Sequence, residues 1–126
     1  MSPSPPATLL RTLGLHARFE RVTAVHSLDL ALREGEIYGF LGRNGAGKTT
    51  TIRMLTGIIR PDSGTLEVMG SASRRTTVRQ KQFLGYVAQE QHFYPWMTPE
   101  VLGRFVSGFF RAWDTDEYRR LLRLLD

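Results

Sequence analysis

The sequence predicts an α/β fold, and three observations lead to that prediction. Short apolar and β-branched segments, typical of strands, fill the first part of the chain. A glycine-rich segment, 42–49, separates one of them from residues with apolar side chains at helical spacing. The C-terminal third carries helical spacing in two segments. At 126 residues and 41% hydrophobic content, the chain is long enough to bury one core.

The elements before the glycine-rich segment are predicted to be mostly strands. Residues 1–7 are rich in serine and proline, which favours a disordered tail. Residues 9–32 are apolar in short bursts broken at Gly14, which indicates two or three short antiparallel strands. After a polar turn, the compact apolar run 37–41 is typical of a strand buried on both faces.

After the glycine-rich segment, helices and strands are predicted to alternate at first, and the last two elements are both helices. We expect a helix over 49–59, which the Pro61 segment ends, and a strand over 65–69. Residues 71–82 are polar and basic and should form a loop with a short helix. The remaining expected elements are a strand over 83–88 and helices over 99–110 and 114–125.

Composition excludes several classes of function. The chain has no cysteine, so it has no disulfides or thiolate sites, and it has no apolar run of about eighteen residues. No signal-peptide pattern is present, so we expect a cytoplasmic protein. The net charge is +5, but the densest basic cluster has no interleaved aromatic residue, so we expect no specific nucleic-acid partner. That cluster consists of Arg74, Arg75, Arg79 and Lys81.

The glycine-rich segment fits the phosphate-binding pattern G-x-x-x-x-G-K-[ST] at every fixed position. It reads Gly42-Arg43-Asn44-Gly45-Ala46-Gly47-Lys48-Thr49. Glycines let backbone N–H groups approach a phosphate, Lys48 supplies an ammonium for the β- and γ-phosphates, and the Thr49 hydroxyl suits a bridging Mg²⁺. The expected strand before it and helix after it supply the required context, with the helix dipole adding positive potential.

Two other interpretations of this segment are weaker. A chance match in a chain of this length is expected on the order of a few times per thousand sequences, which argues against a glycine-rich turn with an incidental lysine. A dinucleotide-binding fingerprint does not fit, because no G-x-G-x-x-G can be drawn through these glycines. The expected ligand is therefore a nucleoside triphosphate with magnesium.

Residues 35–51 and 57–70 together resemble the ATP-binding cassette (ABC) ATPases of ABC transporters. The resemblance implies a P-loop NTPase fold of ABC type, present in part: antiparallel strands, P-loop strand and helix, Q-loop strand and the start of a helical subdomain. It implies a division into a partial nucleotide-binding core, 8–94, and the helical subdomain, 95–126. The implied phosphate-binding residues are Gly42, Arg43, Asn44, Gly45, Ala46, Gly47, Lys48, Thr49 and Thr50.

The resemblance assigns roles to two residues outside the P-loop. Phe19 lies where the family stacks an aromatic ring on adenine, although tyrosine is commoner there. Segment 85–90 looks like the family's Q-loop, so Gln89 would contact Mg²⁺ or position the attacking water, beside Lys48 as a charge stabiliser. Without the resemblance, Phe19 is more typical of a core aromatic residue, and Gln89 of a polar residue that ends a strand.

The family's remaining motifs are not found in these residues. There is no LSGGQ-type signature, and no apolar strand ends in Asp-Glu. Asp116-Glu117 follows polar residues and should form the first turn of a helix, while Arg123 interrupts the apolar run before Asp126. His16, His26 and His92 all precede the position of the switch histidine.

Two hypotheses about function follow. In the first, this is the ATP-binding part of an ABC transporter ATPase, which would couple ATP hydrolysis to transport, with drug or antibiotic export suggested by general similarity. Its partners would be a transmembrane subunit and a second nucleotide-binding subunit, and it would sit at the inner face of the membrane. In the second, it is a module that binds nucleotide without hydrolysing it. A basic, nucleic-acid-associated ATPase is a minor third possibility.

Overall fold

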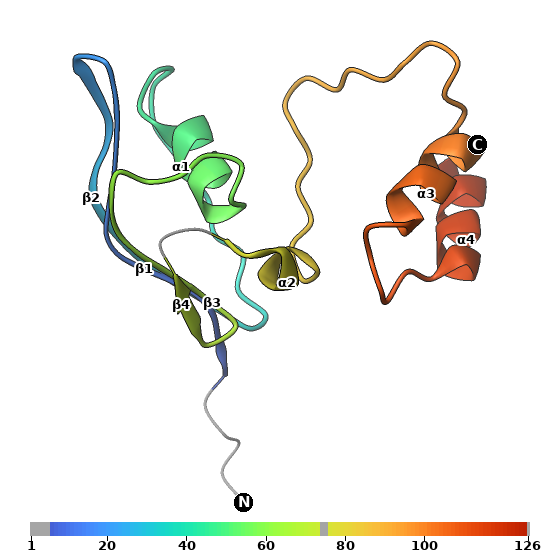
Figure 1. Cartoon of the computed structure of the whole chain (residues 1–126), viewed down its shortest axis with the longest axis horizontal. Helices are drawn as coiled ribbons and strands as arrows, with labels where there is room; N and C mark the ends of the chain where they lie inside the picture. Colours follow the sequence, from blue (N-terminus) through green and yellow to red (C-terminus); the bar gives the residue numbers. More distant parts are fainter. Residues whose placement is uncertain (1–5, 74–75, 126) are drawn as a thin grey trace, which may run out of the picture. The chain divides into compact units, whose positions relative to one another are not determined.

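The computed structural model describes residues 6–73 and 76–125. The predictions for the tail, for Arg74 and Arg75 and for Asp126 fall wholly or partly outside these residues. The chain forms two compact units, Met1–Gly85 and Tyr86–Asp126, and each is described by itself. Figure 1 shows the sheet and α1 in the first unit and the helix pair α3 and α4 in the second.

The first unit contains a four-stranded antiparallel sheet. Its strands are β1 (Thr8–Phe19), β2 (Val22–Arg33), β3 (Ser63–Val68) and β4 (Ser71–Ser73), in the order β2-β1-β3-β4. The predicted antiparallel strands at the N-terminus are thus confirmed as two strands of 12 residues each. The strand predicted over 65–69 is confirmed as β3, and β4 is an addition within the predicted loop 71–82.

Irregular register lets both long strands bury one continuous face. In β1, Leu10 and Thr12 are buried before Gly14, and Leu15 and Ala17 are buried after it. The pairing with β2 shifts between Thr12 and Leu15, and Gly14 adopts φ +58° there. Such a bulge adds a residue, so the alternation changes parity and the apolar side chains stay on the core side.

Helix α1 (Lys48–Leu55) covers the buried face of the sheet. It contributes Met54 and Leu55 to a hydrophobic core shared with β1, β2 and β3, and its Thr51 is also buried. The predicted helix over 49–59 is confirmed at its start but ends earlier. Gly57 adopts φ +69°, and the N–H groups of Ile58 and Ile59 both bond the carbonyl of Arg53. A left-handed glycine after the last turn is a common way for a helix to stop.

The two strands predicted over 37–41 and 83–88 are wrong. Both segments are extended or irregular and join no sheet, and Ile37 is 100% and Leu41 96% exposed. An apolar run becomes a strand only when a neighbour accepts its backbone hydrogen bonds, and no described strand of this chain pairs with either segment.

The short helix predicted within 71–82 is confirmed as α2 (Val78–Lys81). Thr77 and Gln80 form a capping box at its start, in which each side chain bonds the other residue's backbone N–H. Gln80 is also buried, and its Nε2 donates to the carbonyl of Ser71 at 2.8 Å. This bond connects α2 to β4.

The second unit contains α3 (Pro99–Ser107) and α4 (Thr115–Leu125), which confirms both predicted C-terminal helices. Thr98 caps α3, and Asp114 accepts from the N–H groups of Asp116 and Glu117 at the start of α4. The helices meet at Gly103, where an added Cβ would collide with the Tyr118 ring. The Tyr118 hydroxyl donates to the Pro99 carbonyl at 2.7 Å.

The Asp116-Glu117 pair lies in the first turn of α4, as predicted. Glu117 accepts two bonds from Arg120, at 2.6 and 2.7 Å, and this partner lowers the pKa of the Glu117 carboxyl from its usual value. In the part of the chain that the structure describes, no helix is long and apolar enough to cross a membrane.

Candidate functional site

The glycine-rich segment leads directly into α1 and leaves the start of that helix uncapped. Lys48 is the first helical residue and Gly47 is the N-cap, with φ +81° and no side-chain cap bond. No acidic residue lies in the first turn. The first backbone N–H groups of a helix lack partners within the helix, so this end carries donors and a positive dipole.

Two glycines of the segment differ in what surrounds them. Gly45 adopts φ +84° and has nothing within 4 Å of an added Cβ, so its backbone borders open space. At Gly47 an added Cβ would collide with the carbonyl oxygen of Ala24 in β2 and lie 3.3 Å from Val25 Cγ2. Gly45 therefore keeps the loop surface open, and Gly47 lets α1 pack on the sheet. A hydrogen bond from the Ala46 N–H to the Arg43 carbonyl, at 3.1 Å, forms a turn over residues 43–46 of the loop.

The Lys48 ammonium lies over the loop. Its Nζ donates to the carbonyl oxygens of Gly42 at 2.6 Å and of Arg43 at 2.7 Å. An ammonium prefers a charged acceptor to a neutral carbonyl, so an anion above the loop would attract this group. The next side chain, Thr49, is exposed, whereas Thr51 is buried in the core.

Phe19 lies at the same end of the β1–β2 hairpin as the loop. It pairs with Val22 at the hairpin turn, and the strand that follows contacts Gly47 at Ala24 and Val25. In Figure 1 the hairpin turn and the loop before α1 lie at the same end of the first unit. Phe19 is 52% exposed, so its ring is not buried in the core.

Gln89 is exposed and belongs to the second unit. The structure thus groups residues 42–50 and Phe19 within one unit, and the role predicted for Gln89 stays a prediction. The packing role of Gly47 could not be predicted from the sequence, since the motif does not indicate its contact with Ala24.

The residues of the loop fit a triphosphate. The uncapped helix start, the open backbone at Gly45 and the Lys48 ammonium all present positive charge or N–H donors to one region, without a nearby carboxylate in the first turn. Among the described residues, no cluster of three or more histidine or acidic side chains could hold a metal by itself. A magnesium ion here would need phosphate oxygens as additional ligands, as is usual for this ion.

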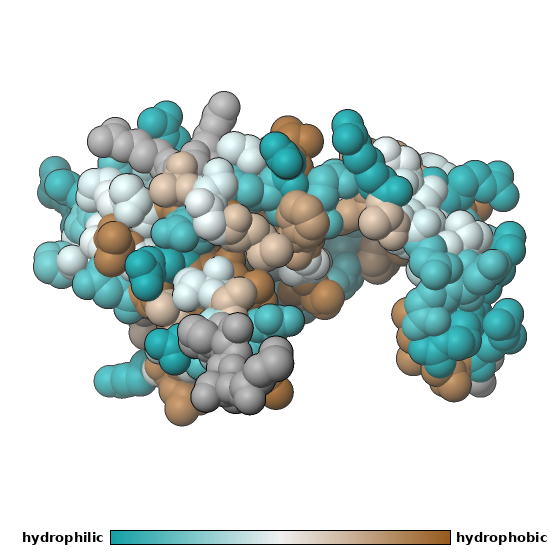
Figure 2. Space-filling model, turned by 90° about the horizontal axis from the view of Figure 1, so that it is seen from below, coloured by the Kyte–Doolittle hydropathy of each residue, from teal (hydrophilic) through white to brown (hydrophobic). Residues whose placement is uncertain are grey.

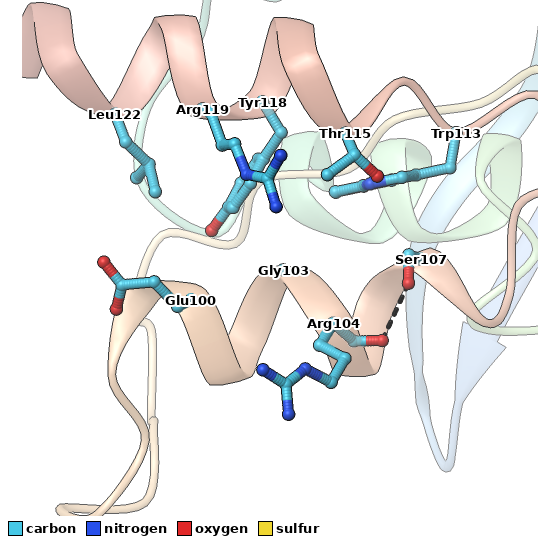
Figure 3. Close-up of a pocket in the computed structure, with 9 residues that line it drawn as sticks. All are labelled: Glu100, Gly103, Arg104, Ser107, Trp113, Thr115, Tyr118, Arg119 and Leu122. Carbon is cyan, nitrogen blue, oxygen red and sulfur yellow. Dashed lines mark hydrogen bonds between the residues drawn. The ribbon is translucent and has the colours of Figure 1, made fainter.

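Two of the cavities that described residues line lie away from the loop. One, of about 270 Å³, opens between α3 and α4 (Figure 3), where Glu100, Arg104 and Arg119 surround a space bordered by Trp113 and Tyr118. The Glu100 carboxyl has its pKa lowered by its own backbone N–H bond and by Thr98. The other cavity, of about 380 Å³, lies between the β3–β4 turn and α2.

A family model decides the identity of the chain. The model described as "ABC transporter" matches residues 25–126, which include the loop, α1 and all of the second unit. The chain belongs to the ABC transporter family.

Several relatives are similar in sequence to most of this ABC family chain. It is 36% identical over 107 residues to the probable multidrug ABC transporter ATP-binding protein YbhF of Escherichia coli, covering 85% of this chain and 18% of that protein. It is 39% identical to the bacitracin transport ATP-binding protein BcrA of Bacillus licheniformis, over 73% of this chain and 30% of the relative. It is also 36% identical to the arabinose import ATP-binding protein AraG 2 of Burkholderia cenocepacia, over 97% of this chain and 24% of that protein.

Solved structures share the fold. An ATP-binding subunit of an ABC transporter matches with a TM-score of 0.77 and 25% identity, over 94% of this chain and 49% of that one. A dimeric ATP-binding cassette in a post-hydrolysis state with ADP and Pi matches with a TM-score of 0.70 and 18% identity, over 89% of this chain and 53% of that one. The chain therefore spans less than a third of the three curated relatives and about half of these two cassettes.

Proposed function

We propose that residues 42–50 bind the triphosphate of ATP, and that this chain is the ATP-binding part of an ABC transporter ATPase. The observation that carries the proposal is the uncapped start of α1, preceded by an open glycine backbone and with the Lys48 ammonium folded over the loop. Membership of the ABC transporter family supports it.

Each residue would have a distinct task. The N–H groups of the loop and of the first helical turn would hold the phosphates, and Lys48 would leave the carbonyls of Gly42 and Arg43 to contact the β- and γ-phosphates. Thr49 and Gln89 would hold Mg²⁺, which offsets the negative charge of the phosphates when bound. Phe19 would stack on adenine, because its half-exposed ring lies at the same end of the hairpin as the loop.

We also propose that the 126-residue chain binds ATP without hydrolysing it. Hydrolysis requires a group that orients the attacking water. The acidic pair Asp116-Glu117 is a poor candidate, because it lies in the first turn of an exposed helix and Glu117 is paired with Arg120. In the whole protein, hydrolysis would be coupled to transport through a transmembrane subunit and a second nucleotide-binding subunit, at the cytoplasmic face of the membrane.

Drug or antibiotic export is the transport activity that we propose. The multidrug and bacitracin names of two relatives support it, although the arabinose importer matches a larger share of the chain. The same loop geometry would equally serve the alternative, a nucleotide-binding module that is not part of a transport cycle.

The two lysines of the chain provide a matched test. Both amines donate to backbone carbonyls, Lys48 to those of Gly42 and Arg43 and Lys81 to that of Gly57 at 3.0 Å, so either replacement removes an amine–carbonyl interaction within the fold. We expect Lys48→Ala to weaken MgATP binding at least tenfold, which corresponds to about 1.4 kcal/mol. Lys81→Ala should leave the affinity unchanged. Titration calorimetry and phosphate release would be measured on the same samples.

The readouts separate the proposals. Equal affinity of the Lys48 and Lys81 variants would refute phosphate binding by the loop. Phosphate release by the wild-type chain above the Lys48→Ala background would refute the proposal that the chain does not hydrolyse ATP, while leaving the binding site in place.

A further inference from the structure

His16 and His26 form a pair of imidazoles across strands β1 and β2. Their ring centroids lie 5.7 Å apart and their planes meet at 73°. The β1–β2 pairing explains why they meet, since Leu15 pairs with Leu28 and Ala17 with Val25. The one residue of β1 between these pairs, His16, therefore faces two residues of β2, His26 and Ser27. Neither histidine has a role in the proposed nucleotide site.

The pair lies on the face of the sheet opposite the core. His16 is flanked by Leu15 and Ala17, both buried, so its own side chain projects to the other side. His16 is partly exposed and His26 is exposed, and both rings are accessible to water. These are therefore not histidines that fill a core.

The spacing of the rings suits one shared metal ion. Transition metals bind neutral imidazole nitrogen at about 2.1 Å, so two rings on one tetrahedral ion would have their centroids roughly 5 Å apart. The observed 5.7 Å is close to that spacing. The antiparallel strands already hold the two backbones together, and both side chains are at least partly exposed.

The charges around the pair include two carboxylates. Asp29 accepts from the Gly14 N–H at 2.6 Å, and Asp62 accepts from the Arg18 N–H at 2.7 Å while its own N–H bonds the His16 carbonyl at 2.9 Å. Arg18 is the nearby cation, and its Nε bonds the Glu20 carbonyl. These carboxylates do not complete a three-ligand cluster with the histidines, so water would fill the other coordination positions.

We propose that His16 and His26 form a two-imidazole binding site for a divalent transition-metal ion of the Zn²⁺ or Cu²⁺ class. The ion joins β1 to β2 at the irregular part of their pairing and therefore stabilises the folded hairpin. Because imidazole sites follow the usual order of affinities, Cu²⁺ binds more tightly than Zn²⁺.

The three histidines of the chain provide the test. Untagged chain, without nucleotide, would be titrated with CuCl₂ and with ZnCl₂ in a non-chelating buffer. We expect one ion per chain for the wild type and for His92→Gln, and at least a tenfold loss of affinity for His16→Gln and for His26→Gln. His92 is a suitable control because it is exposed, interacts with Glu90 and lies in the other unit. The absence of cysteine removes thiolates as competing ligands.

A second measurement does not depend on how well the variants fold. The electron paramagnetic resonance spectrum of wild-type chain with less than one equivalent of Cu²⁺ should show coupling to two equatorial nitrogens. Coupling to one nitrogen or to none would overturn the proposal, and so would an equal loss of affinity in His92→Gln. Far-ultraviolet circular dichroism of the metal-free variants would confirm that both retain the fold.

Discussion

Gly47 shows how one residue serves both the core and the loop. Its backbone packs against the Ala24 carbonyl so closely that a Cβ would collide with it, and its φ of +81° is unfavourable for other residues. Gly45 shares the left-handed conformation but has open space beside it. The two glycines are therefore needed for different reasons, one for packing and the other for access to the loop.

This difference predicts different effects of the two alanine substitutions. Gly47→Ala should destabilise the first unit by about 2 to 4 kcal/mol, because left-handed strain adds to a backbone collision. Gly45→Ala should cost about 1 to 2 kcal/mol from strain alone, yet weaken MgATP binding at least tenfold by placing a methyl group on the loop surface. Urea unfolding and nucleotide titration of both variants provide the measurements.

Equal stability of the two variants would contradict the role given to the Ala24 contact. Full affinity in Gly45→Ala would instead contradict phosphate binding at the open backbone, and would leave the packing of Gly47 unaffected.

The residues of the loop could be predicted from the sequence because the motif is local. Eight consecutive residues determine the pattern, and the start of α1 at Lys48 agrees with it. The Gly47 contact with Ala24 and the His16–His26 pair could not be predicted in this way. Both depend on which residues face each other across β1, β2 and α1, and irregular register decides that.

At the scale of the elements, Gly64 and Gly14 let β3 approach β1. Gly64 adopts φ +88°, and an added Cβ would collide with the Gly14 carbonyl oxygen and lie 2.7 Å from the Leu15 Cα. The β1–β3 pairing shifts at this point, between Leu13 and His16. At the other end of β3, Gly70 has a similar φ of +75° but nothing near its missing side chain.

We therefore expect Gly64→Ala to destabilise the sheet far more than Gly70→Ala. Both substitutions should cost about 1 to 2 kcal/mol for left-handed backbone, and Gly64→Ala should add about 1 to 3 kcal/mol because a strand must move. Thermal unfolding followed by circular dichroism would measure the difference. Similar melting temperatures for the two variants would show that β3 can move away from Gly14 at little cost.

The incorrectly predicted strands show what apolar patterning leaves out. Residues 37–41 and 83–88 are apolar, which indicates a preference for burial, but a strand also requires a paired neighbour. The hairpin β1–β2 supplies its own partner through a short turn, so its antiparallel arrangement could be predicted. The pairing of 37–41 would have to come from distant residues, which a local pattern does not reveal.

At the scale of the whole molecule, large apolar side chains remain exposed. Ile37 and Leu41 are nearly fully exposed in the first unit, and several aromatic residues in the second, among them Tyr94 and Trp96, are more than half exposed. Figure 2 shows hydrophobic residues in brown among the hydrophilic surface of one face. Exposed apolar segments without backbone partners favour association between chains.

We predict that the chain aggregates through the segment 37–41. Replacing Ile37 and Leu41 together by Asn and Gln leaves the net charge unchanged and removes two side chains that take no part in the core cluster. Light scattering during storage should fall severalfold, while the melting temperature changes little because exposed substitutions alter stability by roughly 0.5 kcal/mol or less.

A variant with Leu124→Gln and Leu125→Gln provides the matched control. These leucines of α4 are 67% and 85% exposed and lie in the other unit, so their replacement removes a comparable amount of apolar surface. If the control reduces scattering as much as the Ile37 and Leu41 variant, association follows total apolar surface and the segment has no special role. If only the Ile37 and Leu41 variant reduces scattering, the lack of a paired neighbour for 37–41 accounts for the aggregation. The two variants differ in whether the replaced residues lie in this unpaired segment, and not in charge.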